Sequence, residues 1–292
     1  MRCRRSVCLG PGRSDGHAVF TSIVPIPEAQ RDQRGWALPM TEQDQDRITS
    51  RTSDYLREVE EEWVGGKKAT HIVVSPGDPA EEILRIAAEE AVDLIVIASH
   101  SRGMLGRLRF GSVADRITRS SSIPVLVIRP QDGDPELEPR RFGRFIVALD
   151  GSERAEKAVS VVRRLARETG DGVHLLSVIP DFDVQAVPSP WLGHSVSTVD
   201  LGEVAIELER QMVDKLTRLA DELNNEGVST TFSVVTGDPF QVIDEVARHD
   251  DIIALTTHGR GGVERWALGS LAEKLVRHAN APVLIVSARS ES

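Results

Sequence analysis

Short apolar runs and longer amphipathic segments alternate through the second half of the chain. Five apolar runs predict strands, and the segments between them carry apolar residues at helical spacing. The predicted strands are 144–149, 173–179, 230–235, 252–255 and 283–286, and the predicted helices are 155–168, 203–226, 240–247 and 270–278. Because strands that alternate with helices form parallel sheets with right-handed crossovers, this half is predicted to be an α/β unit with a five-stranded parallel sheet.

The first half of the chain repeats much of this pattern. Strands are predicted at 18–24, 70–74, 94–98 and 125–128, with a charged helix that follows Thr41 and closes at Gly65-Gly66. Many residues recur 158 positions later, namely His100, Arg102, Gly103, Arg107, Gly111, Ser112, Ala114, Arg119, Pro124, Val125 and Leu126. A constant offset over a loop, a helix and a strand is an internal repeat. The chain is therefore predicted to be a tandem of two similar α/β units.

The boundaries of these units follow from local composition. Residues 130–143 are rich in proline and charge and lack apolar periodicity, which is typical of a linker. Residues 1–17 are rich in arginine and lack the apolar core of a secretion signal, so they are predicted to be poorly structured. The predicted organisation is a first unit over 18–129, the linker, and a second unit over 144–292.

A glycine-rich turn separates the fourth strand of the second unit from the helix that follows it. Thr256 ends the strand, Gly259 lies in the turn, and Gly269 and Ser270 begin the predicted helix. Main-chain N–H groups at such a turn and at a helix N-terminus favour a phosphate or another anion. Glycine leaves room for the anion, and the Ser270 hydroxyl adds a donor. The alternative is that the glycines only form a tight turn and Ser270 only caps the helix.

The spacing of these four residues carries a resemblance to a known family. Thr256-x2-Gly259-x9-Gly269-Ser270 resembles the nucleotide-binding pattern Gly-x2-Gly-x9-Gly-Ser/Thr of the universal stress protein family, with Thr256 in place of the first glycine. The resemblance covers residues 144–287. It implies a flavodoxin-like fold, also described as adenine nucleotide α hydrolase-like, in which this loop binds the triphosphate and ribose of ATP.

Asp150 provides a second landmark, because the strand ending in Asp150-Gly151-Ser152 is also similar to that family. The resemblance implies that Asp150 reaches the ribose hydroxyls or a nucleotide-bound magnesium ion, and that Val178 lines the adenine. The alternative is that Asp150 only caps the next helix. The nucleotide-binding residues that the resemblance implies, none of them catalytic, are Ala148, Asp150, Val178, Thr256, Gly259, Gly269, Ser270 and Leu271.

The first unit departs from the family pattern in two ways. Its corresponding segment reads Ala98-x2-Ser101-x9-Gly111-Ser112, so side chains replace the first two glycines. Nothing before residue 18 resembles the first strand of the family or the helix that follows it. The first unit is therefore predicted to lack that strand and helix and to bind nucleotide poorly.

Composition narrows the range of partners. With 45 acidic and 35 basic residues, the chain carries a formal net charge of −10, which argues against a nucleic-acid or anionic membrane surface. No apolar run approaches the length of a membrane span. The two cysteines, Cys3 and Cys8, exclude a disulfide framework and a zinc site built from two cysteine pairs. We expect a cytoplasmic protein.

Three classes of function remain open at this stage. The resemblance favours a regulatory stress-response protein that binds ATP or AMP, with or without magnesium, in its second unit. A weak ATP hydrolase is the second class: Asp150 and Arg260 are available, but no general base and no Gly-x4-Gly-Lys-Ser/Thr loop is evident. The third class is a purely structural protein that binds no nucleotide.

The family resemblance also implies a mode of assembly. Members of the family commonly dimerise along the edge of the last strand, which corresponds here to residues 125–128 and 283–286. Both segments are apolar, and an uncovered edge of that kind promotes aggregation. We therefore expect the two repeats to form an intramolecular pseudo-dimer, with a homodimer as the alternative.

Overall fold

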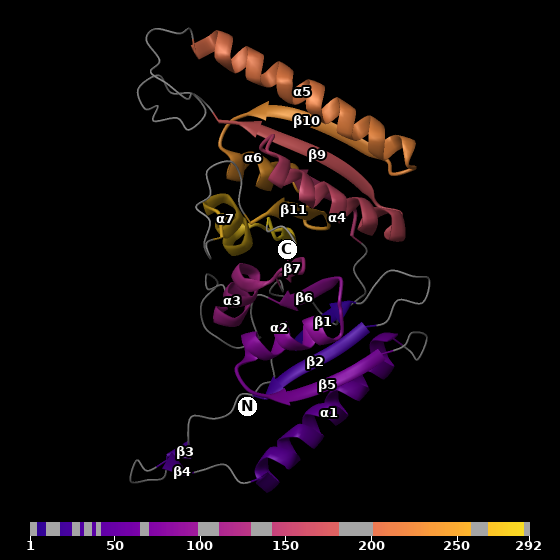
Figure 1. Ribbon diagram of the computed structural model, residues 1–292, viewed down its shortest axis with the longest axis vertical. Helices are drawn as coiled ribbons and strands as arrows, with labels where there is room; N and C mark the ends of the chain where they lie inside the picture. Colours follow the sequence, from indigo (N-terminus) through magenta and orange to yellow (C-terminus); the bar gives the residue numbers. More distant parts are fainter. Residues whose placement is uncertain are drawn as a thin grey trace. The chain divides into compact units, whose positions relative to one another are not determined.

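The chain divides into two compact units, Met1–Ile128 and Arg129–Ser292. The computed structural model (Figure 1) describes residues 5–9, 18–24, 30–31, 37–38, 42–64, 70–98, 111–129, 142–180, 201–257 and 268–288. The predicted linker therefore lies almost wholly outside the described residues. Two units agree with the tandem organisation predicted from the internal repeat.

The second unit has the predicted alternation of strands and helices. Its elements are β8 (Arg144–Ala148), α4 (Glu153–Thr169), β9 (Gly172–Ile179), α5 (Leu201–Asn225), β10 (Thr230–Thr236), α6 (Pro239–Val246), β11 (Ile252–Thr256), α7 (Ser270–His278) and β12 (Val283–Val286). The strand order is β10-β9-β8-β11-β12, and every neighbouring pair is parallel. The order reverses between β8 and β11. The prediction of a five-stranded parallel sheet is confirmed here.

The central strands of this unit are buried on both faces, as apolar runs without alternation predict. Ile146 in β8, Leu175 in β9 and Ile253 in β11 are fully buried. Right-handed crossovers place α4 and α5 on one face of the sheet and α6 and α7 on the other, and α6 also contacts α7. The sheet is therefore covered on both sides, and its carboxyl edge is left for loops and helix starts.

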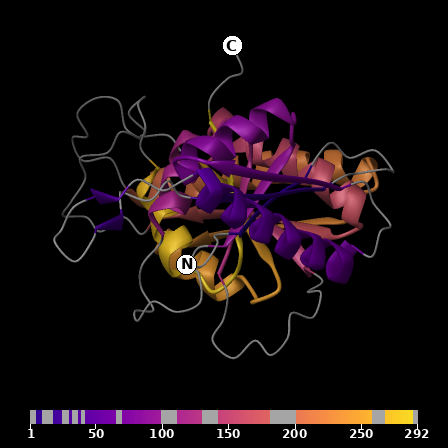
Figure 2. The ribbon, with the colours of Figure 1, turned by 90° about the horizontal axis from the view of Figure 1, so that it is seen from below.

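The first unit contains the corresponding elements and a small hairpin. They are β1 (Arg5–Leu9), β2 (Ala18–Val24), β3 (Gln30–Arg31), β4 (Ala37–Leu38), α1 (Glu42–Val64), β5 (Thr70–Pro76), α2 (Pro79–Glu89), β6 (Leu94–Ala98), α3 (Ser112–Ser120) and β7 (Val125–Ile128). The order in the sheet of this unit is β7-β6-β1-β2-β5. Figure 2 shows α1, in indigo, on one side of these strands and α2 and α3, in purple, on the other.

Strand β1 corrects the prediction that residues 1–17 are poorly structured. It pairs with β2 on one side and β6 on the other, the place that β8 holds in the second unit, but it is antiparallel to both neighbours. Antiparallel strands need only a short connection, whereas a parallel pair needs a crossover. Only eight residues, 10–17, separate β1 from β2 in the sequence, a length that allows an antiparallel connection but is too short for a crossover helix. Within the described residues, the first unit thus has an antiparallel strand in the place of the parallel first strand, and its sheet is mixed.

A buried ion pair lies at the amino-terminal ends of the strands of the second unit. The Asp251 carboxylate, whose side chain is only 2% exposed, accepts from Arg144 Nε at 3.1 Å and from the Arg248 N–H at 3.0 Å. His174 is nearby, with its ring nitrogens 2.8 and 3.0 Å from the hydroxyls of Thr231 and Ser233. Burial and the positive charge of Arg144 lower the pKa of His174. The surroundings of the ring therefore favour its neutral form.

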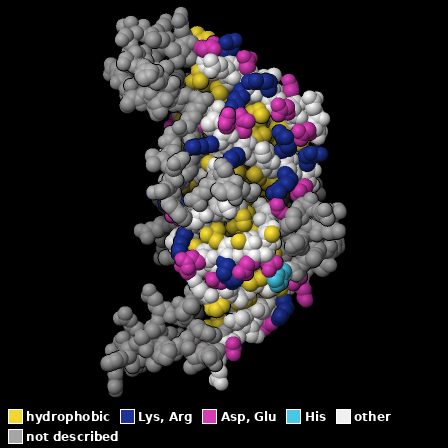
Figure 3. All heavy atoms as spheres, in the orientation of Figure 1, with side chains coloured by type: hydrophobic (Ala, Val, Ile, Leu, Met, Phe, Trp, Pro, Cys, Tyr) yellow, Lys and Arg dark blue, Asp and Glu magenta, His cyan; other side chains and the backbone are white. Residues whose placement is uncertain are grey.

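On the face shown in Figure 3, acidic and basic side chains are intermixed over the coloured residues. No helix in the described part of the chain is long and apolar enough to span a bilayer. Within the same residues, no group of three or more His, Cys, Asp or Glu side chains is arranged to hold a metal ion.

Candidate functional site

A cavity of about 400 Å³ lies at the carboxyl ends of β8, β9 and β11 in the second unit. The starts of α4, α6 and α7 and two side chains of α5 complete its wall. In doubly wound sheets, ligands bind at this edge, next to the point where the strand order reverses. The cavity is lined by Ala148, Leu149, Asp150, Ala155, Leu176, Ser177, Val178, Ile179, Pro180, Leu208, Met212, Pro239, Ile243, Leu255, Thr256, Thr257, Gly269, Ser270, Leu271 and Ala272.

Asp150 is held in a tight turn at the rim of this cavity. Its Oδ1 accepts from the Ser152 N–H at 3.0 Å and from the Ser152 hydroxyl at 2.7 Å. Between them, Gly151 has φ +80°, a conformation that favours glycine. Ser152, not Asp150, is the N-cap of α4, because its side chain accepts from the Ala155 N–H. Asp150 is therefore not the N-cap of α4, contrary to the alternative interpretation from the sequence.

The start of α7 faces the same cavity. Gly269 is the N-cap residue and has no side chain with which to cap the first turn, and Ser270 is the first helical residue. The Gly269 N–H donates to the Thr257 carbonyl at 2.7 Å, and its carbonyl accepts the first helical bond from Glu273 at 2.8 Å. The first-turn N–H groups of a nine-residue helix have no partner within the helix. This end of the cavity therefore suits an anion.

Two buried threonines fix the end of β11 beside the start of α7. The Thr257 N–H donates to the Val286 carbonyl at 2.9 Å, and its hydroxyl accepts from the Ala288 N–H at 3.1 Å. Thr256 is 7% exposed and lines the cavity at the position where the family pattern has glycine. The backbone around the predicted anion site is therefore anchored to β12.

The wall between Asp150 and the start of α7 is apolar. It includes Val178, which the sequence predicts, and also Leu208 and Met212 of α5 and Ile243 of α6. Sequence reasoning missed the α5 residues as part of a site, because their helical spacing is that of ordinary core positions. Only their place at the carboxyl edge distinguishes them. An apolar wall with a few polar groups is typical of a small-molecule site.

The structure brings the predicted binding residues together. Those that line the cavity are Ala148, Asp150, Val178, Thr256, Gly269, Ser270 and Leu271. The eighth, Gly259, lies outside the described residues. Asp150 is the only ionisable side chain among the described residues that line the cavity.

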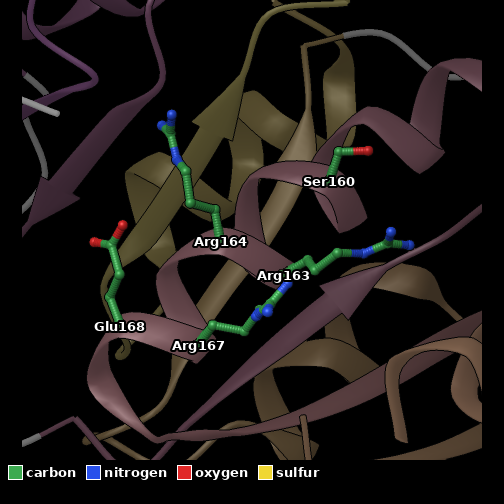
Figure 4. A pocket seen from close by; sticks show the side chains of 5 residues that line it. All are labelled: Ser160, Arg163, Arg164, Arg167 and Glu168. Atoms are coloured by element: carbon green, nitrogen blue, oxygen red, sulfur yellow. The ribbon is translucent and has the colours of Figure 1, made fainter. Parts of the chain in front are cut away.

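A second hollow, of about 310 Å³, lies on the outer side of α4 (Figure 4). Its side chains do not converge on one point, because Arg164 and Glu168 extend to one side of the helix and the others to the opposite side. Arg163 and Arg167 also lie 3.1 and 3.8 Å from the carboxylate of Glu226, the residue that follows α5. Local ion pairs thus offset the positive charge, and this hollow is a poorer candidate than the cavity. It is lined by Ser160, Arg163, Arg164, Arg167 and Glu168.

Comparison with known proteins agrees with this geometry. The model of the universal stress protein family matches residues 12–129 and again 141–287. A universal stress protein of Mycobacterium tuberculosis is 28% identical over 210 residues, which cover 71% of this chain and 65% of the relative. The chain thus matches less than two thirds of that relative's length.

Two solved structures share the fold over both units. A universal stress protein from Archaeoglobus fulgidus matches 86% of this chain and 84% of its own, with a TM-score of 0.58 and 19% identity. A structure described as a putative universal stress protein from Pseudomonas aeruginosa matches 92% of both chains, with a TM-score of 0.57 and 14% identity. At these identities the likeness concerns the fold alone.

Proposed function

This chain belongs to the universal stress protein family, and we propose that its second unit binds an adenine nucleotide, ATP or AMP, in the cavity at the carboxyl edge of the sheet. The observation that carries the proposal is the make-up of that cavity. A helix start suited to an anion, a carboxylate and an apolar wall face one space of about 400 Å³. These three features complement the phosphates, the ribose hydroxyls and the base of a nucleotide, respectively.

Each part of the nucleotide then has a place. The phosphates lie against the main-chain N–H groups at the start of α7, where the Ser270 hydroxyl adds a donor. The base lies against the apolar wall that contains Val178 and Met212. Asp150 accepts hydrogen bonds from the ribose hydroxyls, or holds a magnesium ion that the nucleotide carries.

The lining favours binding over hydrolysis. Phosphoryl transfer needs cationic groups to stabilise charge on the phosphate, and a residue that orients the attacking water. Among the described residues that line the cavity, Asp150 is the only ionisable one, and none is cationic. We therefore propose a regulatory role, in which bound nucleotide reports on the state of the cell, in preference to turnover.

Calorimetric titration of the full chain with ATP and with AMP tests this proposal. We expect about one site per chain, because the first unit has Ser101 where the second has Gly259, and an antiparallel strand in place of the first parallel one. Inorganic tripolyphosphate, which lacks the nucleoside, should bind more weakly than ATP. Two equivalent sites would contradict the proposed asymmetry, and no binding of either nucleotide would favour a purely structural protein.

A further inference from the structure

Lys215 connects α5 to the turn that carries Asp150. Its Nζ donates to the Gly151 carbonyl at 2.8 Å and lies 2.7 Å from Glu156 Oε1. The Lys215 side chain is only 24% exposed, so both contacts are partly shielded from water. A charge-assisted hydrogen bond in such a place is stronger than a neutral one. The ammonium therefore holds together α5, the β8–α4 turn and the first turns of α4.

The two partners of Lys215 lie on either side of the N-cap of α4. Gly151 stands between Asp150 and Ser152, which are themselves joined by the two hydrogen bonds to Asp150 Oδ1. Those bonds set the shape of the turn, but they join only residues of the turn to one another. The bond from Lys215 is a contact that ties the turn to another element, 64 residues away in the chain.

The same part of α5 also forms a wall of the cavity. Leu208 and Met212 line it, and Lys215 follows Met212 by three residues, so the three side chains lie along neighbouring faces of one helix. Met212 is only 4% exposed and packs as a core residue. A helix held this firmly gives the Lys215 ammonium a fixed position relative to the cavity wall.

We propose that Lys215 is a positioning residue that fixes the Asp150 turn against the cavity wall and so sets the strength of nucleoside binding. This inference rests on the proposed nucleotide site. Lys215 acts through the turn, since it contacts the Gly151 carbonyl and is not among the residues that line the cavity. Its effect therefore falls on the nucleoside end of the ligand and spares the phosphate end at α7.

The test compares Lys215→Met with Arg210→Met in the full chain. Arg210 is a cation on the same helix whose guanidinium pairs with Glu207, one turn away, at 2.9 and 3.0 Å. By calorimetry in the absence of magnesium, Lys215→Met should weaken ATP binding about tenfold and leave tripolyphosphate binding unchanged. Arg210→Met should change neither, and Lys215→Arg should keep most of the ATP affinity. Equal losses for ATP and tripolyphosphate, or no loss for ATP, would overturn the proposal.

A double variant separates action through Asp150 from a general structural effect. If Lys215 acts by placing Asp150, then Lys215→Met should weaken ATP binding no further in a chain that already carries Asp150→Ala. Additive losses would show that the two residues act independently and would overturn the proposal. Circular dichroism establishes that each variant is folded.

Amide hydrogen exchange decides the same question without nucleotide. The N–H groups of Ser152 and Ala155 donate within the turn, so loosening the turn exposes them to exchange. In the ligand-free protein, Lys215→Met should accelerate exchange at both amides about tenfold, whereas Arg210→Met should leave it unchanged. Unchanged exchange in Lys215→Met would overturn the positioning role even if ATP binds. Failure of the parent chain to bind ATP, with accelerated exchange in the variant, would refute the proposed function alone.

Discussion

The Gly269→Val variant is expected to lose ATP binding, with a Kd raised at least about 100-fold, or about 2.7 kcal/mol. Gly269 has φ −58° and ψ 151°, which valine tolerates, so backbone strain is not the cause. The cause is bulk, because the residue lines the cavity at the point where the phosphates would approach the start of α7. Calorimetry of the folded variant with ATP measures the loss.

Gly111 supplies a matched control within the chain. It is the N-cap of α3 in the first unit, with φ −68° and ψ 141°, and like Gly269 it has no side chain with which to cap the helix. Gly111→Val should leave ATP binding unchanged, since we place no nucleotide in that unit. If correctly folded Gly269→Val bound ATP as tightly as the parent chain, the segment before α7 would be only a turn.

Arg144→Met is expected to lower the free energy of unfolding of the second unit by about 3 kcal/mol. The variant removes the Arg144 guanidinium from the buried Asp251 carboxylate and leaves the Arg248 N–H donating to it. Arg144 also donates to the Val246 carbonyl at the end of α6, and that bond is lost as well. A buried carboxylate that loses its cationic partner is costly because it stays largely removed from water. Urea denaturation measures the change.

Two comparisons test this cause. Arg210→Met removes an exposed ion pair on α5, whose side chains are 66% and 49% exposed, and should destabilise the unit far less than Arg144→Met does. The double variant Arg144→Met, Asp251→Asn removes the buried charge yet keeps an acceptor for the Arg248 N–H, so it should recover at least about half of the loss. A cost for Arg144→Met no larger than that for Arg210→Met would contradict the account.

Apolar patterning predicted most of the fold because strands buried on both faces and amphipathic helices leave clear signals. The bounds of β2, β6 and β12 agree with the predicted runs. Helix α1 spans Glu42–Val64, which agrees with the helix predicted between Thr41 and Gly65 even though its first turns are polar. The direction of β1 could not be predicted from the sequence. A five-residue strand has the same pattern of apolar residues whether it runs parallel or antiparallel to its neighbours.

The parts of the candidate site that have a characteristic spacing of residue types could be predicted from the sequence. The glycine and serine at the start of α7 and the Asp150 turn have recognisable sequence patterns, and the structure places them around one cavity. Leu208 and Met212 carry no such signal, because a helix face that packs on a sheet and one that lines a cavity have the same apolar spacing. The bond from Lys215 to the Gly151 carbonyl is also invisible in sequence, since a backbone acceptor leaves no residue-type signature.

Photocrosslinking of the full chain with 8-azido-ATP, followed by peptide mapping, tests the central claim most directly, because it reports where the base lies. We expect label on the end of β9 or on α5, at residues that line the cavity, such as Val178 or Met212. Excess ATP should suppress the label, and Gly269→Val should abolish it. Label confined to the first unit, or label that persists in folded Gly269→Val, would contradict the placement of the nucleotide in the second unit.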